Sequence, residues 1–201
     1  MTRRVVVAVL IGLGAGCATL RPPSQAVLDS VYVYVEGPGR YNAKASLVLI
    51  QCADGARWPV TAAHVAAEIQ HQYPIRAQDV ARDVAVLELP ASWTGPGLPL
   101  GRLPRRGDLV WLIHAPAGIA NLLSWGMVAR VSQDQLVVAG SGFGGSSGGA
   151  VVNRAGELVG ILIGLRGEIP GWGLYQGALF AVAVPAIRAV LTTVDADCAA
   201  T

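Results

Sequence analysis

The stretch from Gly142 to Val152 reads G-F-G-G-S-S-G-G-A-V-V, and the interpretation of the whole chain starts from it. Its middle places two serines, Ser146 and Ser147, among glycines and ahead of an apolar run. Glycine tolerates positive φ and close backbone approach, so such a turn can direct N–H groups inward. Two inward N–H groups beside a serine hydroxyl form an oxyanion hole next to a nucleophile. A flexible glycine-serine loop has the same composition, so other stretches must decide between the two interpretations.

Two further stretches supply a base and a carboxylate. The sequence T-A-A-H-V at 61–65 places His64 after an apolar strand pattern and a turn of small residues. The sequence D-V-A-V-L-E-L at 83–89 places Asp83 at the head of an alternating strand pattern, whereas the competing Asp79 falls before that pattern. The order His, Asp, Ser is one of three chain orders known for the hydrolytic triad. Together the three stretches predict a base, an orienting carboxylate and a nucleophile.

These motifs resemble the trypsin-like serine proteases, and most closely the bacterial trypsin-like peptidases of the HtrA/Deg kind. The matching pieces are T-A-A-H-V, D-V-A-V-L-E-L, and G-S-S-G-G-A-V-V-N followed by A-G-E-L-V-G-I. A weaker match is L-V-W-L-I-H-A-P-A-G at 109–118, where those peptidases carry a G-x-P-x-G turn. The resemblance implies an all-β fold of two barrels and a serine endopeptidase. Such an enzyme acts on a protein or peptide substrate through an acyl-enzyme intermediate and needs no cofactor.

The resemblance also assigns roles to individual residues. It makes Ser147 the nucleophile, because the family pattern places that serine directly before two glycines, and leaves Ser146 as its neighbour. His64 would take the proton of the serine, and Asp83 would hold the tautomer of the imidazole. The backbone N–H groups of Gly145 and Ser147 would form the oxyanion hole.

Three positions align with the pocket that binds the residue before the scissile bond. Ser141 aligns with the base of this pocket and is uncharged, which argues against a preference for Lys or Arg. Ile163 stands where digestive relatives carry a serine that supports the triad aspartate. Leu165 aligns with a pocket wall that is glycine in wide-pocket relatives. We therefore expect small or medium apolar residues at the cleavage position.

One departure from the family pattern keeps other functions open. The connection from His64 to Asp83 is short for the family, which predicts a minimal or imperfectly closed first barrel. One alternative is a catalytically silent relative that uses the same barrels to bind a partner protein. Another is a protease that cuts itself once and then falls silent. The complete set of triad residues favours the enzyme, because a binding module has no use for it.

Composition narrows the class of protein further. The 201 residues are 53% hydrophobic and 14% charged, which excludes a disordered chain. The 25 glycines and 12 prolines favour a turn-rich, all-β chain. The net charge of +2 and the lack of a basic stripe with interleaved aromatics argue against nucleic acid as a partner. No H-E-x-x-H motif or paired cysteine spacing occurs, so no metal is expected.

Many short strand patterns separated by turn signals predict barrels, and among the predicted strands are 109–114, 122–131 and 135–139. The domain plan follows from them, with a peptidase domain at 31–194 and a tail at 195–201. Within the domain we expect an N-terminal barrel at 31–92, a C-terminal barrel at 105–184 and a final helix at 186–194.

The N-terminal segment carries the marks of export. Residues 1–16 contain two arginines, then an uncharged apolar run, and then small residues ahead of Cys17, as in a secretory signal. The run is shorter than the roughly 20 residues of a membrane span. L-G-A-G-C also resembles a bacterial lipobox, which implies lipidation of Cys17, a tether at 17–30, and a lipid-anchored protein of the cell envelope. The alternative is an ordinary signal cut near Ala18 and a secreted or periplasmic protein.

The other two cysteines fit an exported protein. If Cys17 is lipidated, Cys52 and Cys198 remain as an even pair in an oxidising compartment. In folds of the family the last helix packs near the first barrel, so the resemblance implies that these two can form a disulfide. Two free thiols are the alternative.

Overall fold

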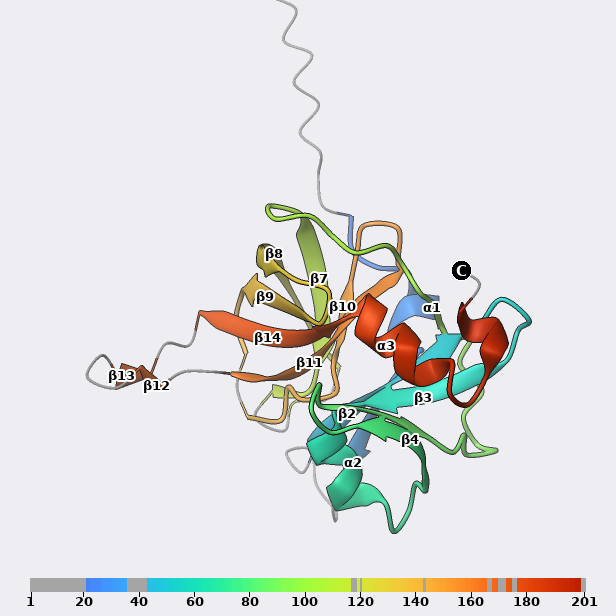
Figure 1. The fold of residues 1–201 in the computed structure, drawn as a ribbon. Helices are drawn as coiled ribbons and strands as arrows, with labels where there is room; N and C mark the ends of the chain where they lie inside the picture. Colours follow the sequence, from blue (N-terminus) through green and yellow to red (C-terminus); the bar gives the residue numbers. More distant parts are fainter. Residues whose placement is uncertain are drawn as a thin grey trace, which may run out of the picture.

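The fold consists of two β units that lie side by side, with a C-terminal helix packed against both (Figure 1). The computed structural model describes residues 21–35, 43–116, 119, 121–142, 144–165, 168–169, 173–174 and 177–199. The predicted signal segment 1–16 and Cys17 lie outside these residues. None of the helices in the described part of the chain is both long and apolar enough to cross a bilayer.

The first unit is an antiparallel sheet that carries one short parallel strand. Its strands are β1 (Val31–Val35), β2 (Ala43–Gln51), β3 (Arg57–Thr61), β4 (Ile75–Asp79), β5 (Val84–Leu87) and β6 (Leu98–Pro99). They follow the order β1-β2-β3-β5-β4, and β6 pairs with β2. Over the described residues the path does not close on itself. This open path fits the expectation from the short connection between His64 and Asp83.

Aromatic rings fill the gap between the two ends of this sheet. Tyr32 on β1 stacks on Trp93 with ring centroids 4.0 Å apart, and Tyr34 meets Tyr73 edge-on at 6.4 Å. Tyr73, which lies just before β4, also contacts Trp93 at 5.5 Å. Large rings thus cover the first core where strand pairing ends, because they bury much apolar surface per residue.

The second unit is a closed barrel. Its strands are β7 (Leu109–His114), β8 (Leu122–Val131), β9 (Gln135–Ala139), β10 (Ala150–Val152), β11 (Leu158–Leu165) and β14 (Ala178–Ala183). They close in the order β10-β11-β14-β9-β8-β7, while β12 (Glu168–Ile169) and β13 (Gly173–Leu174) form a separate hairpin. Inward side chains such as Leu112, Leu136 and Leu162 are fully buried. The predicted all-β fold of two barrel units is confirmed.

A shared apolar core joins the two units. It contains Ile50 and Val86 from the first sheet and Ile113 and Ile161 from the barrel, all with 0% exposure. The helix α3 (Val184–Leu191) covers this core and buries Ile187 in it. It begins two residues before the predicted 186–194 because its proline lies inside the first turn, where a missing N–H costs nothing.

Short helices occupy the segments before and after the two units. The predicted tether 17–30 contains α1 (Gln25–Leu28), and the predicted tail 195–201 contains the 3-10 helix η2 (Ala196–Ala199). Cys198 in η2 forms a disulfide with Cys52, with the two Cα atoms 4.6 Å apart. Nearby, Trp58 Nε1 donates a hydrogen bond of 3.0 Å to Asp195. The end of the chain is thereby fixed to the β2–β3 hairpin.

Loss of this disulfide is expected to lower the free energy of unfolding by about 4–5 kcal/mol, because it closes a long loop in the unfolded chain. Cys52 and Cys198 are 146 positions apart. Urea unfolding of the C52S/C198S variant measures the loss. The single variant C17S is the control, since it removes a thiol and leaves the bond in place. Equal stability of the double variant and the control would contradict the prediction.

Candidate active site

The structure brings His64 and Asp83 into direct contact. β3 ends at Thr61, and α2 (Ala63–Ile69) follows after a single buried alanine, Ala62. His64 Nδ1 lies 2.8 Å from Asp83 Oδ2, and the backbone N–H of His64 donates to Asp83 Oδ1 at 2.9 Å. One carboxylate therefore fixes both the ring and the backbone of the histidine. The histidine side chain is 47% exposed, so its other ring nitrogen has access to solvent.

The turn before β5 holds Asp83 in an unusual backbone conformation. Asp83 has φ +59°, in the left-handed region that aspartate enters more readily than most residues. Sparsely populated backbone conformations of this kind cluster at functional sites. The competing Asp79 is occupied elsewhere, because Arg82 donates to it from both its guanidinium and its backbone N–H. The geometry therefore favours Asp83 over Asp79 as the partner of His64.

The contact with Asp83 also sets the protonation of the histidine. The hydrogen bond that His64 donates to Asp83 is the largest influence and raises the pKa of His64 above 6.5, and burial opposes it. The negative charges of Asp83 and Glu68 raise this pKa further. A base must be neutral to accept a proton, so His64 becomes competent only as the pH rises through this raised pKa.

The glycine-serine turn is held between the two units. Gly148 N–H donates to Leu162 C=O at 2.7 Å, and Leu162 N–H donates to Gly149 C=O at 2.8 Å. From the other side, Ser46 N–H on β2 donates to the carbonyl of Ser147 at 3.0 Å. These bonds connect the turn to β11 of the barrel and to β2 of the first sheet.

Gly148 shows why the turn requires glycine. It has φ +80°, and a Cβ at this position would collide with the carbonyl of Ser46 and the hydroxyl of Thr61. Thr61 stands only three positions before His64 and donates to the same carbonyl at 2.8 Å. The serine turn thus packs directly against the end of β3, the strand that leads into α2.

The two serines of the turn differ in how far they are buried. Ser146 is 1% exposed, whereas Ser147 is half-buried. Ser146 Oγ lies 2.9 Å from Nδ1 of His114, and Nε2 of the same ring lies 3.1 Å from Ser124 Oγ. Ser146 therefore points into the barrel, and Ser147 is the serine with access to a substrate.

Sequence reasoning missed the pairing of His114 with Ser146, which are 32 positions apart. The available signal was a histidine within an otherwise apolar strand. His114 is fully buried, and a buried imidazole requires hydrogen-bond partners. Burial lowers the pKa of His114 to about 4, so its ring stays neutral down to about pH 4.

We expect His114 to make the fold less stable as the pH falls from 6.5 to 4. Over this range the unfolded chain binds a proton at His114 that the folded chain does not. The free energy of unfolding should therefore fall by about 3 kcal/mol by pH 4 because of this group alone. Urea unfolding of the wild type and of the H114Q variant at pH 7 and pH 4 measures the difference. An identical pH dependence in the two proteins would contradict the prediction.

The proposed base and nucleophile are not hydrogen-bonded to each other, and the proposed oxyanion donors have no partner among the described residues. No hydrogen bond joins His64 to the hydroxyl of Ser147, both of which the structure describes. Such bonds are often long in the absence of substrate and tighten when it binds.

The backbone N–H groups of Gly145 and Ser147 donate to no described residue, and Gly145 has φ +91°. Both N–H groups are therefore available to an oxyanion.

The three predicted pocket positions lie in different environments. Ser141 is exposed. Ile163 on β11 lines a cavity of about 430 Å³ together with Asp83 and Phe180, so it lies beside the carboxylate of Asp83. The backbone of Leu165 pairs with Leu179 on β14, and the side chain of Leu165 lies outside the described residues.

Potential metal ligands gather in two groups within the described part of the chain, and both include Asp195. One group adds Cys52 and Cys198, whose sulfurs are bonded to each other. The other adds the carboxylates of Asp54 and Asp197. Neither group contains His64, Asp83 or Ser147.

The sequence matches the model of a family described as the trypsin-like peptidase domain over residues 34–161. No curated protein matches it. Among solved structures, the serine endoprotease from Yersinia pestis is similar with a TM-score of 0.64 and 24% identity. The alignment covers 88% of this chain and 68% of that one.

Two further structures have the same architecture. The HtrA-type protease AlgW, solved with a tripeptide, has a TM-score of 0.62 and 24% identity over 87% of this chain, which spans 64% of the AlgW chain. Rv3671c from M. tuberculosis H37Rv, an inactive mutant form, has a TM-score of 0.62 and 17% identity, with 86% of this chain and 89% of that chain covered. These likenesses show a shared fold.

Proposed function

The chain belongs to the trypsin-like peptidase domain family and so to the serine endopeptidases, and we propose that it hydrolyses peptide bonds through His64, Asp83 and Ser147. The observation that carries this proposal is the double hydrogen bond from His64 to Asp83 beside a turn whose accessible serine is Ser147. A binding module has no need of an oriented imidazole at this place.

In the first half of the reaction, Ser147 Oγ attacks the carbonyl carbon of the scissile bond while Nε2 of His64 accepts its proton. Asp83 keeps the remaining ring proton on Nδ1 and stabilises the imidazolium that forms. The carbonyl oxygen becomes an oxyanion, which the N–H groups of Gly145 and Ser147 would bind. His64 then gives its proton to the leaving amine, and an acyl-enzyme remains.

In the second half, water replaces the amine. His64 accepts a proton from the water as its oxygen attacks the acyl carbon, and the same oxyanion hole binds the second tetrahedral intermediate. Collapse of this intermediate releases the acid and returns the proton to Ser147. The raised pKa of His64 requires near-neutral or higher pH for both halves.

We propose small or medium apolar residues at the cleavage position. The uncharged Ser141 offers no partner for Lys or Arg, and Leu165 would narrow the pocket. Cleavage of a peptide library, with the new N-termini mapped by mass spectrometry, tests this specificity. Enrichment of basic or large aromatic residues at the cleavage position would contradict it.

We also propose that the protein is exported and anchored to a membrane through lipidated Cys17. The Cys52–Cys198 disulfide supports an oxidising compartment, where such bonds persist. Fractionation of cells that express the wild type and the C17S variant tests the anchor. The wild type is expected in the membrane fraction and the variant in the soluble fraction, and equal distribution would contradict the proposal.

Labelling of the full chain with a fluorophosphonate probe tests the catalytic proposal. The probe reacts with an activated serine, and mass spectrometry of the labelled peptide is expected to locate the adduct on Ser147. The S146A variant should still be labelled, because Ser146 faces His114 inside the barrel. Well-folded protein without a label, or an adduct on Ser146, would overturn the assignment.

A further inference from the structure

One outer face of the barrel carries exposed apolar side chains that the catalytic proposal does not use. Trp125 and Met127 on β8 are 61% and 44% exposed. They pair across the sheet with Trp111 and Leu109 on β7, which are half-buried, so these four side chains share the outer face of the two strands. We call Leu109, Trp111, Trp125 and Met127 the indole face. Solvated apolar surface of this kind marks an interaction site.

The N-terminal segment joins the fold at this face. The indole Nε1 of Trp111 donates to the backbone carbonyl of Arg21 at 2.9 Å. The proposed lipidation site, Cys17, lies only four residues before Arg21. A lipid on Cys17 would therefore lie within the reach of a few residues of chain from the indole face.

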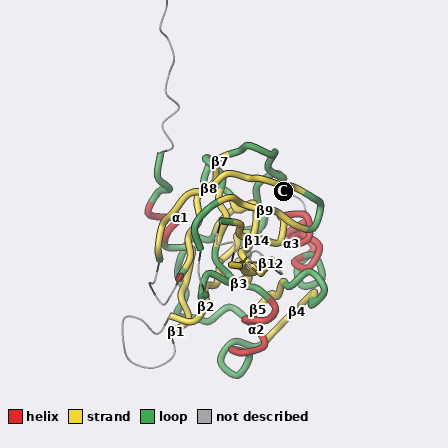
Figure 2. Tube along the Cα trace, turned by 90° about the vertical axis from the view of Figure 1, so that its left-hand side faces the viewer, coloured by secondary structure: helices red, strands yellow, loops and turns green. Residues whose placement is uncertain are grey.

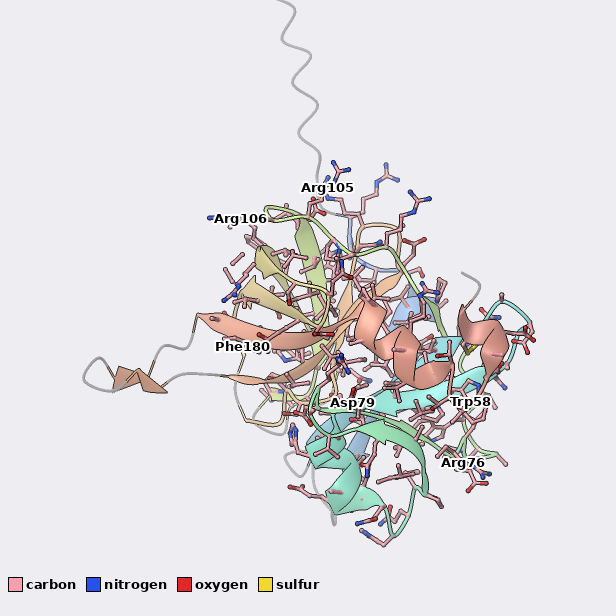
Figure 3. The ribbon with its side chains drawn as sticks, in the orientation of Figure 1. Trp58, Arg76, Asp79, Arg105, Arg106 and Phe180 are labelled. Carbon is pink, nitrogen blue, oxygen red and sulfur yellow. A yellow bond between two sulfur atoms is a disulfide. The ribbon has the colours of Figure 1, made fainter. Side chains whose placement is uncertain are left out.

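Basic side chains surround the same end of the barrel. The N–H of Gly107 donates to Val128 C=O at 2.8 Å, which places Arg105 and Arg106 next to Met127. Figure 3 shows Arg105 and Arg106 at one end of the molecule, away from Trp58 and Arg76. Four exposed arginines of this region make no ion pair with a described residue: Arg21, Arg105, Arg106 and Arg154.

Two acidic groups of this region, Asp108 and Glu157, offset only part of the charge of the four arginines. Asp108 accepts a hydrogen bond of 2.7 Å from the backbone N–H of Arg105, and Glu157 accepts one of 2.8 Å from Asn153. Arg154 lies beside Asp108 and Leu109 along a shallow cleft. The end of the barrel next to Arg21 thus carries basic side chains, and these surround the apolar and aromatic indole face.

We propose that the indole face rests on an anionic lipid bilayer. This inference rests on the proposed membrane anchor, and it adds the surface that meets the membrane. Tryptophan concentrates at the membrane–water interface because its ring is apolar and its N–H remains hydrated. Arginines around such a ring attract the anionic lipid headgroups. An anchor that precedes Arg21 would hold this face at the bilayer.

The proposed contact leaves the candidate active site free. In Figures 1 and 2, α2, which carries His64, lies at the opposite end of the molecule from the labelled ends of β7 and β8. When the indole face is on the bilayer, α2 and its His64 lie at the end of the molecule away from it. A substrate would then approach from solution and not along the membrane surface.

Quenching of tryptophan fluorescence by brominated lipid acyl chains tests the contact. The full chain is reconstituted into vesicles of equal parts phosphatidylglycerol and phosphatidylcholine, with and without bromine on the phosphatidylcholine chains. Bromine quenches only tryptophans near the acyl chains. The wild type is expected to be quenched, and the W125F variant should lose most of the quenched emission. The matched W58F variant should keep it, because Trp58 bonds to Asp195 in the other half of the molecule.

The second part of the experiment varies the charge of the lipid. Quenching should fall in vesicles of phosphatidylcholine alone, and the R105E/R106E variant should show the same fall in anionic vesicles. Equal quenching in W125F and W58F would overturn the proposal, and so would quenching that ignores lipid charge. The latter result would mean that the arginines do not recognise anionic headgroups, and absence of quenching in the wild type would favour an acidic protein as the occupant of the face.

The same samples separate this inference from the catalytic proposal. None of these substitutions touches His64, Asp83 or Ser147, so labelling by the fluorophosphonate probe should equal that of the wild type. Lost labelling would identify a misfolded variant, which a thermal unfolding curve would also reveal. Intact labelling with unchanged quenching in W125F overturns the membrane contact and leaves the peptidase assignment standing.

Discussion

Replacing Ser147 by alanine is expected to lower the kcat of peptide hydrolysis by about 10⁶-fold. The substitution removes the oxygen that forms the acyl-enzyme, so water must attack the substrate directly. The backbone N–H groups of Gly145 and residue 147 remain available, which leaves a residual acceleration of about 10³–10⁴ over water. Stability should change little, because Ser147 is half-buried and its hydroxyl bonds to no described residue.

The neighbouring serine provides a matched control for this experiment. S146A removes a hydroxyl from the adjacent position, but its hydrogen bond goes to His114 inside the barrel. We expect S146A to lose about 1–3 kcal/mol of stability, because it removes a partner of the buried His114 ring, and to keep its nucleophile. Hydrolysis of a peptide substrate, followed by chromatography of the products, compares the two variants. Similar losses of kcat in both, or a larger loss in S146A, would show that Ser147 is not the attacking group.

The parts of the fold that local patterns control could be predicted from the sequence. The strands expected at 109–114, 122–131 and 135–139 have these bounds in the structure, because alternation and turn residues act over a few neighbours. The motif around His64 and the pattern that begins at Asp83 identified two residues that the fold brings within hydrogen-bond distance.

Features that depend on distant contacts were harder to predict. The pairing of His114 with Ser146 needs the curvature of a closed barrel, and no spacing in the sequence encodes it. The aromatic packing of Tyr32 on Trp93 replaces a strand pairing, so alternation could not reveal it. The helix α2 was not among the predicted elements. It has seven residues and no side-chain cap, and its signal is correspondingly weak.

Replacing Asp83 by asparagine is expected to lower kcat near neutral pH by about 10⁴-fold. In the wild type, Asp83 Oδ2 accepts from His64 Nδ1, and Oδ1 accepts from the backbone N–H of the same residue. An asparagine that keeps the backbone bond must place its NH₂ group against Nδ1. The imidazole then carries its proton on Nε2 and cannot accept the proton of Ser147. The nucleophile and the oxyanion hole are intact, but the base is in the wrong tautomer.

The pH profile distinguishes this explanation from simple loss of structure. The hydrogen bond that His64 donates to Asp83 is the main cause of the raised pKa of His64, so D83N should move the acid limb of the kcat profile to lower pH. The control is D79N, the same change four positions earlier, where the carboxylate bonds to Arg82, which also bonds to Asp134. We expect kcat and pH profile of D79N close to those of the wild type. Equal losses in D79N and D83N, or an acid limb that stays in place in D83N, would mean that Asp83 does not orient the base. The short connection between His64 and Asp83 would then be a sign of an inactive site.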